Sequence, residues 1–310
     1  MDLRQLRYFV AVAEEGHVTR AAERLGMQQP PLSQQIKAVE QELGVQLFRR
    51  KARGVELTDA GRVLLDQART VLERLDHALL LTRRTARGEQ GRLLVGIAPT
   101  APFHPFMPQA IRAFREACPL VSVSLEEHLS GQALERLRGE QIDVAFLRAP
   151  VADPQGLAVH RLLEEPMVVA LPSSHGLAGR DIGSGPLSLR ALAGETFILF
   201  GGSAGPGIAD ASVAACQRAG FTPRLGQQAP RIATTLGLVS VGLGIALVPA
   251  SIRRVQVDGV AYRRLRPDER PSAILNLALR RGDPSAVVQN FSDLMRRAAR
   301  SVDQTGEEGQ

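Results

Sequence analysis

The segment that most constrains this chain is residues 18–57, VTRAAERLGMQQPPLSQQIKAVEQELGVQLFRRKARGVEL. A short helix is predicted for Val18–Leu25, which has small or apolar residues at helical spacing and is followed by Gly26, a residue type that often caps helix ends. A second helix is predicted to begin near Pro30 and Pro31, because proline in the first helical turn loses no backbone hydrogen bond. Two short helices joined by a tight turn favour a DNA-reading unit.

The second helix has two chemically different faces. Its apolar face, which we expect to be buried, consists of Leu32, Ile36, Val39 and Leu43. The opposite face carries short, amide-bearing or cationic side chains, namely Ser33, Gln34, Gln35 and Lys37. Such side chains can enter the major groove and bond base edges or hold phosphates. The residues of this helix predicted to contact DNA are Gln29, Pro30, Ser33, Gln34 and Lys37.

A basic ribbon follows the second helix. The segment Val45–Leu57 contains FRRKARG, and four of the five residues 49–53 are cationic, which suits a hairpin wing beside a polyanion. Arg49, Arg50 and Arg53 are expected to contact the DNA backbone or minor groove. The alternative is a common helical packing unit followed by a solvated basic loop. Residues 2–14 favour the DNA interpretation, because they predict a bracing amphipathic helix whose inward residues are Leu3, Leu6, Phe9, Val10 and Ala13.

The stretches LRQLRYFVAVAEEG, TRAAERLGMQQPPLSQQIKAVEQELGVQLFRR and VELTDAG resemble the amino-terminal domain of LysR-type transcriptional regulators. The resemblance extends over about sixty consecutive residues with almost no gap and implies a winged helix-turn-helix that binds promoter DNA. Residues 1–58 are therefore expected to form the DNA-binding domain.

Charge is distributed in agreement with this expectation. The chain has 310 residues and a formal charge of +6, and residues 1–92 hold 16 Lys and Arg against 12 Asp and Glu, a balance of +4. The first third therefore carries most of the positive excess, as a domain that binds a polyanion would. Two isolated cysteines, no signal peptide and no apolar run long enough to span a membrane indicate a cytoplasmic protein.

A long helix is predicted from Thr58 to about Arg84, because leucine, valine and alanine recur every three or four residues. Its apolar stripe would pair with a second copy, although packing against the chain's own body is the alternative. The LysR resemblance implies the same linker helix, so residues 59–90 are expected to join protomers in a homodimer or homotetramer. Gly88 and Gly91 end the helix, and a second domain begins there.

Short apolar runs then alternate with helical patterns, which predicts an α/β domain with a mostly parallel sheet. The predicted strands are Leu93–Ile97, Val121–Leu125, Val144–Leu147, Met167–Leu171, Thr196–Phe200, Ile245–Val248 and Ile274–Leu279. The predicted helices are Met107–Cys118, Gly131–Arg138, Gly207–Ala219, Ile232–Val241 and Ser285–Arg300. Residues 302–310 lack an apolar period and are expected to form a mobile tail.

This second domain resembles the effector-binding part of the LysR family, most clearly over Leu236–Ser251. The resemblance implies two α/β lobes like those of periplasmic binding proteins. Within the expected domain, residues 91–301, lobe I would cover about 91–161 and 267–301 and lobe II about 162–266. The expected architecture is an N-terminal winged helix-turn-helix, a long linker helix and a two-lobed α/β effector domain.

Ligands of such domains bind beyond the carboxyl ends of strands and at helix N-termini. The candidates at these positions are Pro99, Thr100, Ser130, Arg148, Phe200, Gly202 and Ser203. Free N–H groups, two hydroxyls and one guanidinium would bind a small organic acid. The alternatives are an ordinary surface ion pair for Arg148 and plain helix caps for Thr100 and Ser130.

Among LysR-type proteins, the region looks similar to regulators of aromatic-compound breakdown, which respond to muconate-like or benzoate-like acids. In that subgroup a hydroxyl residue after the first strand, a Thr at the position of Ser130 and an Arg at Arg148 contact the effector. The first loop departs from the subgroup pattern, because Pro99, Pro102, Phe103 and Pro105 crowd it.

The dinucleotide fingerprint, the phosphate loop and the HExxH zinc motif are absent from the sequence. Gly242 and Gly244 form a GxG, but Leu247 replaces the third glycine of a dinucleotide fingerprint, and there is no GxxxxGK or HExxH. No metal, cofactor or enzyme activity is therefore expected. Closure of the lobes around the acid would change DNA bending and contact with RNA polymerase. The alternative function is a stand-alone small-molecule binding protein whose first ninety residues only dimerise it.

Overall fold

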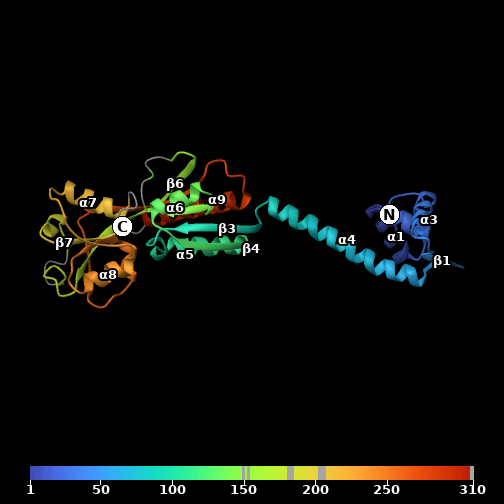
Figure 1. Ribbon diagram of the computed structural model, residues 1–310, viewed down its shortest axis with the longest axis horizontal. Coiled ribbons are helices and arrows are strands. Elements are labelled where there is room, and N and C mark those ends of the chain that lie inside the picture. The colour runs from blue at the N-terminus through green and yellow to red at the C-terminus, as the bar shows by residue number, and fades with distance from the viewer. Residues whose placement is uncertain (149–150, 152–153, 180–184, 202–206, 308–310) are drawn as a thin grey trace. The chain divides into compact units, whose positions relative to one another are not determined.

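The computed structural model describes the chain except for residues 149–150, 152–153, 180–184, 202–206 and 308–310. The chain divides into two compact units, Met1–Arg84 and Thr85–Gln310 (Figure 1). The first unit contains three helices, a two-stranded hairpin and most of a long helix: α1 Leu3–Glu15, α2 Val18–Arg24, α3 Gln29–Leu43, β1 Phe48–Lys51, β2 Gly54–Leu57 and α4 Asp59–Ala86.

The core of the first unit is formed by the apolar faces of α1, α2 and α3 together with the start of α4. Its fully or almost fully buried side chains are Leu6, Phe9, Val12, Ala21, Ala22, Leu32, Ile36, Val39, Leu47 and Ala68. Two inward positions predicted from the sequence are wrong, because Leu3 is 46% and Leu43 is 42% exposed. These two leucines lie in terminal turns of α1 and α3, whereas the core is built from the middle of each helix.

Close backbone contact attaches the hairpin to the helices. The N–H of Val55 donates to the carbonyl of Gly16 in the turn between α1 and α2, at 2.9 Å. Gly54 has a φ of +102°, and a Cβ there would lie 2.2 Å from the oxygen of Gly16. Only glycine fits this approach without displacing the hairpin. Thr58 then caps α4, because its Oγ1 accepts from the N–H of Gly61 at 3.0 Å.

The second unit contains the remaining elements. Its helices are α5 Phe106–Ala117, α6 Ser130–Arg138, α7 Ile208–Arg218, α8 Ile232–Ser240 and α9 Ala286–Glu307, with short 3-10 turns η1 Ala101–Phe103, η2 Leu189–Leu192 and η3 Ala250–Arg254. Its strands are β3 Gln90–Ile97, β4 Leu120–Glu127, β5 Val144–Leu147, β6 Leu157–Pro172, β7 Thr196–Phe200, β8 Arg224–Ala229, β9 Ala246–Pro249, β10 Val260–Arg264 and β11 Ser272–Arg280.

Lobe I is a three-layer sandwich around β4, β3, β5, β11 and the first half of β6. Along β5 the side chains alternate between two cores: Val144 and Phe146 face the core shared with α5 and α9, whereas Ala145 and Leu147 face the core shared with α6. This alternation follows from the two-residue period of a strand. Figure 1 shows α5, α6 and α9 around β3 and β4.

Lobe II has its own apolar core, built from the second half of β6 with β7, β9, α7 and α8. Strand β7 pairs in parallel with β8, and Phe197 forms a parallel bridge to Ile245 next to β9. Strands β9 and β10 instead pair antiparallel with β6.

The two lobes share β6 and β11, which pair antiparallel with each other across the lobe boundary. On β6, Leu163 belongs to the core of lobe I and Met167 to that of lobe II. On β11, Ala273 belongs to the core of lobe II and Leu275 to that of lobe I. The crossings therefore lie a few residues beyond the expected positions near Arg161 and Arg266. Continuous strands make both crossings, so no turn in the sequence marks the boundary.

The prediction of a mostly parallel sheet is wrong. Parallel pairs join β3 to β4, β3 to β5 and β7 to β8, but β6 is antiparallel to β9, β10 and β11, and β11 is antiparallel to β5. The sheet is mixed because the strands that cross between lobes run opposite to the strands of the α/β units. The sequence analysis also missed β8, β10 and the first half of β6.

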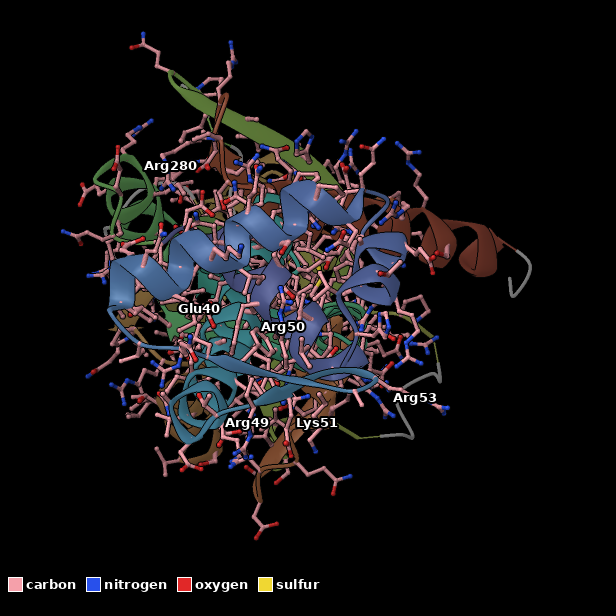
Figure 2. The ribbon with its side chains drawn as sticks, turned by 90° about the vertical axis from the view of Figure 1, so that its right-hand side faces the viewer. Glu40, Arg49, Arg50, Lys51, Arg53 and Arg280 are labelled. Atoms are coloured by element: carbon pink, nitrogen blue, oxygen red, sulfur yellow. The ribbon has the colours of Figure 1, made fainter. Side chains whose placement is uncertain are left out.

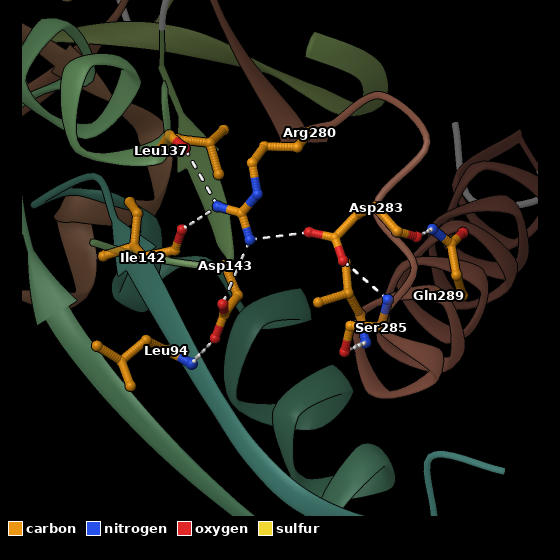
Figure 3. Close-up of polar contacts among 9 residues, drawn as sticks. Leu94, Leu137, Ile142, Asp143, Arg280, Asp283, Ser285 and Gln289 are labelled. Carbon is orange, nitrogen blue, oxygen red and sulfur yellow. Dashed lines mark hydrogen bonds and ion pairs between the residues drawn. The ribbon is translucent and has the colours of Figure 1, made fainter. Parts of the chain in front are cut away.

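Arg280 connects several segments of lobe I (Figure 3). The guanidinium of Arg280 donates to the carbonyls of Leu137 and Ile142, at 3.1 and 2.7 Å, and lies 3.4 and 2.8 Å from the carboxylates of Asp143 and Asp283. Asp143 also accepts from the N–H of Leu94 at 2.7 Å. One cation therefore ties β11 to the end of α6, to β5 and, through Asp143, to β3.

The last helix is longer than predicted. Helix α9 continues to Glu307 rather than ending near Arg300, so the tail expected at residues 302–310 is helical as far as the described residues reach. Within the described part of the chain, no helix is both long and apolar enough to cross a membrane.

Candidate functional site

One exposed side of α3 carries the residues predicted to contact DNA. Gln29, Pro30, Gln34 and Lys37 are exposed and Ser33 is half-buried, so the predicted DNA-contacting residues lie together on one side of the helix. Pro30 lies in the first turn of α3, where its missing N–H breaks no hydrogen bond.

Gln35, which the sequence analysis placed on the polar face, has a different role. Its Oε1 accepts from Nε2 of Gln5 at 3.0 Å and so ties α3 to α1. The side chain is half-buried, whereas its neighbour Gln34 is exposed.

The hairpin carries four cations that differ in their partners (Figure 2). Arg49 and Lys51 lie 3.3 and 2.8 Å from the carboxylate of Glu56 on the opposite strand, and the hydrogen bond from Lys51 lowers the pKa of Glu56. Among the described residues, Arg50 and Arg53 have no acidic partner. The uncompensated charge of the hairpin is therefore concentrated on Arg50 and Arg53.

Glu40 fixes the hairpin relative to α3. Its carboxylate accepts from the N–H groups of Leu47 and Phe48, at 2.8 and 3.1 Å. Glu40 thus connects the polar face of α3 to the cationic hairpin. The face of α3 offers short polar groups that can bond base edges, and the hairpin offers guanidinium groups that can bind phosphates.

In the second unit, the carboxyl ends of β3 and β5 lie side by side, and the predicted effector residues of lobe I meet there. Ile97 pairs with Phe146 in the parallel ladder, so Thr100 and Arg148 follow neighbouring strand ends. The hydroxyl of Ser130, at the N-terminus of α6, accepts from the backbone N–H of Arg148 at 3.1 Å. The structure therefore brings Thr100, Ser130 and Arg148 to one edge of the sheet.

Arg148 is not part of a surface ion pair, which was the alternative interpretation of its charge. Its guanidinium pairs with the carboxylate of Glu165, and the two side chains are only 3% and 5% exposed. It also donates to the carbonyl of Ala273 at 3.2 Å, while Glu165 accepts from the N–H and hydroxyl of Ser251, at 2.8 and 3.2 Å. Burial lowers the pKa of Arg148, and the charge of Glu165 opposes that shift. This buried network lies where β6 and β11 cross between lobes.

Two buried polar atoms at this edge have no hydrogen-bond partner among the described residues: Oγ1 of Thr100 and Nε of Arg148. Thr100 is completely buried. An unsatisfied buried donor or acceptor costs free energy comparable to a lost hydrogen bond, so such atoms usually have a water or ligand partner. Pro99, the residue before Thr100, is also buried.

The loop after β3 reaches lobe II. Phe103 packs against the core of lobe II, and η1 lies against η3. His104 follows, and its Nδ1 accepts from the N–H of Phe106 at 3.2 Å. Burial lowers the pKa of His104, while the charge of Glu165 raises it and those of Arg148 and Arg254 lower it further. The prolines that set this loop apart in the sequence thus flank a contact between lobes.

One further predicted site residue, Phe200, lies in lobe II. Phe200 ends β7 and is 5% exposed within the core of that lobe. Gly202 and Ser203 lie outside the described residues. The sequence analysis missed Glu165, Ser251 and His104. Glu165 lies just before the predicted strand Met167–Leu171, in the part of β6 that the sequence analysis missed, so no strand pattern marked it.

These two units define a DNA-binding protein with a separate two-lobed binding domain. Residues 3–62 match the bacterial regulatory helix-turn-helix protein family of lysR type, and residues 86–300 match the LysR substrate binding domain. The chain therefore belongs to the LysR family of DNA-binding transcriptional regulators and has an effector-binding domain.

Relatives match over nearly the whole chain. The HTH-type transcriptional regulator CatR of Pseudomonas putida is 39% identical over 301 residues, covering 96% of this chain and all of CatR. The regulator AlsR of Bacillus subtilis (strain 168) is 38% identical over 265 residues, or 86% of each chain. The crystal structure of CbnR, a LysR family transcriptional regulator, is 30% identical with a TM-score of 0.83, covering 96% of this chain and 100% of CbnR. CbnR complexed with its target DNA gives a TM-score of 0.81 at the same identity and coverage.

The family confirms the expected fold, a winged helix-turn-helix with a linker helix and a two-lobed effector domain. AlsR, BudR and CatR, three relatives that match, are HTH-type transcriptional regulators. Across the described residues, no group of three or more His, Cys, Asp or Glu side chains is arranged to hold a metal ion.

Proposed function

We propose that this protein is a transcriptional regulator that is controlled by a small carboxylate-bearing effector bound between lobes I and II. The observation that carries the proposal is the pair of unpartnered buried atoms, Oγ1 of Thr100 and Nε of Arg148, at adjacent strand ends. A hydroxyl and a guanidinium N–H are a suitable pair for one carboxylate.

The charge around this position limits the effector. Because Glu165 already neutralises Arg148, the site contributes hydrogen-bond donors without a large excess of positive charge. A monocarboxylate, or one carboxylate of a larger acid, suits it better than a compact dianion. The effector would act by differential affinity for two lobe arrangements, since the network of Arg148, Glu165 and Ser251 joins strands and turns of both lobes.

DNA would be read by α3 and held by the hairpin. Ser33 and Gln34 have the chemistry for base edges, Gln29, Pro30 and Lys37 lie on the same face, and Arg49, Arg50 and Arg53 suit phosphates. Residues 1–58 would be the DNA-binding domain, 59–90 the linker and 91–301 the effector domain.

The linker helix α4 would join two copies. Val63, Val71, Leu79 and Leu80 on α4 are exposed, and an apolar groove of about 750 Å³ lies between α4 and the first turn of α1, lined by Leu3, Leu64 and Val71 among others. The occupant that fits is the same helix of a second copy, since a regular spacing of apolar residues continues along α4. Further contacts between effector domains would give a tetramer, and effector binding would then alter contact with RNA polymerase.

The test is fluorescence anisotropy of the purified protein on DNA from its own upstream region, titrated with salt and then with benzoate, muconate and acetate. Sequence-specific binding that weakens steeply with salt and changes with one acid would support the proposal. Specific DNA binding that no acid alters would contradict the carboxylate effector. Acid binding without specific DNA binding would favour the stand-alone carrier, and turnover of the acid would favour an enzyme.

A further inference from the structure

A second cavity, of about 340 Å³, lies in lobe II. Three arginines from three segments line it: Arg253 at the end of η3, Arg264 at the end of β10, and Arg270 in the segment before β11. The rest of its lining is apolar and includes Pro166, Met167, Val168 and Leu265. The lining of the cavity thus combines three cations with apolar side chains.

The three guanidinium groups are not neutralised by the protein. None of them forms an ion pair or a side-chain hydrogen bond within the part of the chain that the structure describes. Glu269, beside Arg270 in sequence, has other partners, because its carboxylate accepts from the hydroxyl of Ser188 and the N–H of Leu189. Like charges gathered around one cavity repel each other, and an apolar wall strengthens their field. A bound anion would remove this repulsion.

The size and geometry of the cavity limit the ligand. Its volume is near the lower end of small-molecule sites, which span roughly 300–1,000 Å³. Arginine forms paired hydrogen bonds with the oxygens of phosphate and carboxylate groups. We propose that this cavity is a second anion site, separate from the cleft between the lobes, that binds a small ligand carrying two or more phosphate or carboxylate charges.

The cavity adjoins the network of Arg148, Glu165 and Ser251 that joins the lobes. Its lining residues Pro166, Met167 and Val168 directly follow Glu165 on β6. Arg253 is two residues after Ser251, which donates to Glu165. An anion held by Arg253 would therefore fix η3 against the part of β6 that follows Glu165.

The test is isothermal titration calorimetry of the full-length protein with pyrophosphate and, separately, with citrate. The expected result is saturable binding of one equivalent per chain, weakened about tenfold or more by Arg264→Gln or Arg270→Gln, because each removes a charge-assisted hydrogen bond. Tighter binding of pyrophosphate would identify a phosphate-bearing ligand, and tighter binding of citrate a polycarboxylate.

Arg266→Gln is the matched control, because Arg266 is an exposed arginine of the same segment that does not line the cavity. Arg266→Gln should change the anion affinity by less than about twofold, which would exclude a non-specific effect of net charge. Binding lost equally in Arg266→Gln, or lost in Arg50→Gln on the hairpin, would overturn the proposal, as would no saturable binding of either anion. Arg264→Gln and Arg270→Gln leave Thr100 and Arg148 unchanged, so failure of the cleft proposal does not affect this one.

Discussion

At the scale of single residues, Arg148 and Glu165 form an ion pair whose two side chains are both buried. Breaking a buried ion pair leaves one charge without a partner and typically costs about 3–5 kcal/mol. Arg148→Met is therefore expected to lower the free energy of unfolding of the second unit by that amount in urea titrations. The double variant Arg148→Met/Glu165→Leu should recover most of the loss, since neither charge remains buried.

The control for this prediction is Arg161→Met. Arg161 pairs with Glu164 on the same strand as Glu165, but the two side chains are 60% and 40% exposed. Exposed pairs contribute about 0–1 kcal/mol. Equal losses in Arg148→Met and Arg161→Met would mean that Arg148 is not a buried charge in solution.

His104 gives the second unit a pH-dependent component of stability. Burial lowers its pKa below the ordinary value of 6.5, so the folded protein favours the neutral ring. This contribution is fully present above the ordinary pKa and is lost as the pH falls through the lower, folded pKa. The thermal midpoint of the wild type should therefore fall more between pH 7.5 and pH 5 than that of His104→Gln. Parallel curves for the two proteins would contradict the prediction.

Position along the chain explains which site residues the sequence predicted. Thr100 and Arg148 directly follow apolar strands, so their location at a sheet edge could be predicted from the sequence. Glu165 and Ser251 could not, because their pairing depends on a tertiary contact between β6 and η3. Leu3 was misplaced for the related reason that helical periodicity does not show where a core ends.

At the scale of elements, the cations of the hairpin differ in whether an acidic side chain compensates their charge. Arg50 and Arg53 lack acidic partners in the described structure, whereas Glu56 compensates Arg49 and Lys51. If Arg50 and Arg53 each neutralise one phosphate, Arg50→Gln and Arg53→Gln should each reduce the slope of log affinity against log salt by about 0.9. Anisotropy on operator DNA at several salt concentrations measures this slope.

Glu56→Gln is the opposite test of the same hairpin. Removing its carboxylate frees Arg49 and Lys51, so DNA affinity at low salt should rise and the salt slope should steepen. If the salt slope is unchanged in Glu56→Gln and also in Arg50→Gln, each tested singly, the hairpin lies away from the phosphates.

Elements with a strong internal pattern were predicted closely, and β5 and β7 have the predicted bounds. Strand β8 was missed because LGQQ has neither apolar alternation nor strand-forming residues, and it exists through pairing with β7. The mixed direction of the sheet was missed for a similar reason. Pattern within a strand does not give the direction of its neighbours.

At the scale of the whole molecule, α4 would determine whether a single chain or a pair binds DNA. Val71 is 46% exposed and lines the apolar groove between α4 and α1, so its replacement should not disturb the core of one chain. A charge there would be desolvated in a dimer. Val71→Asp is therefore expected to weaken self-association at least tenfold, measured by sedimentation velocity over a range of concentrations.

Thr70→Asp is the matched control, because it introduces the same charge one residue away, on a different side of the helix. If α4 joins two copies through its apolar stripe, only Val71→Asp should sediment as a smaller assembly than the wild type. The same variant should also lose affinity for DNA with two half-sites, whereas affinity for a single half-site should be retained, since the recognition surface on α3 is unchanged. Retained mass in both variants would instead assign self-association to the effector domains, and the exposed stripe of α4 would then need another partner.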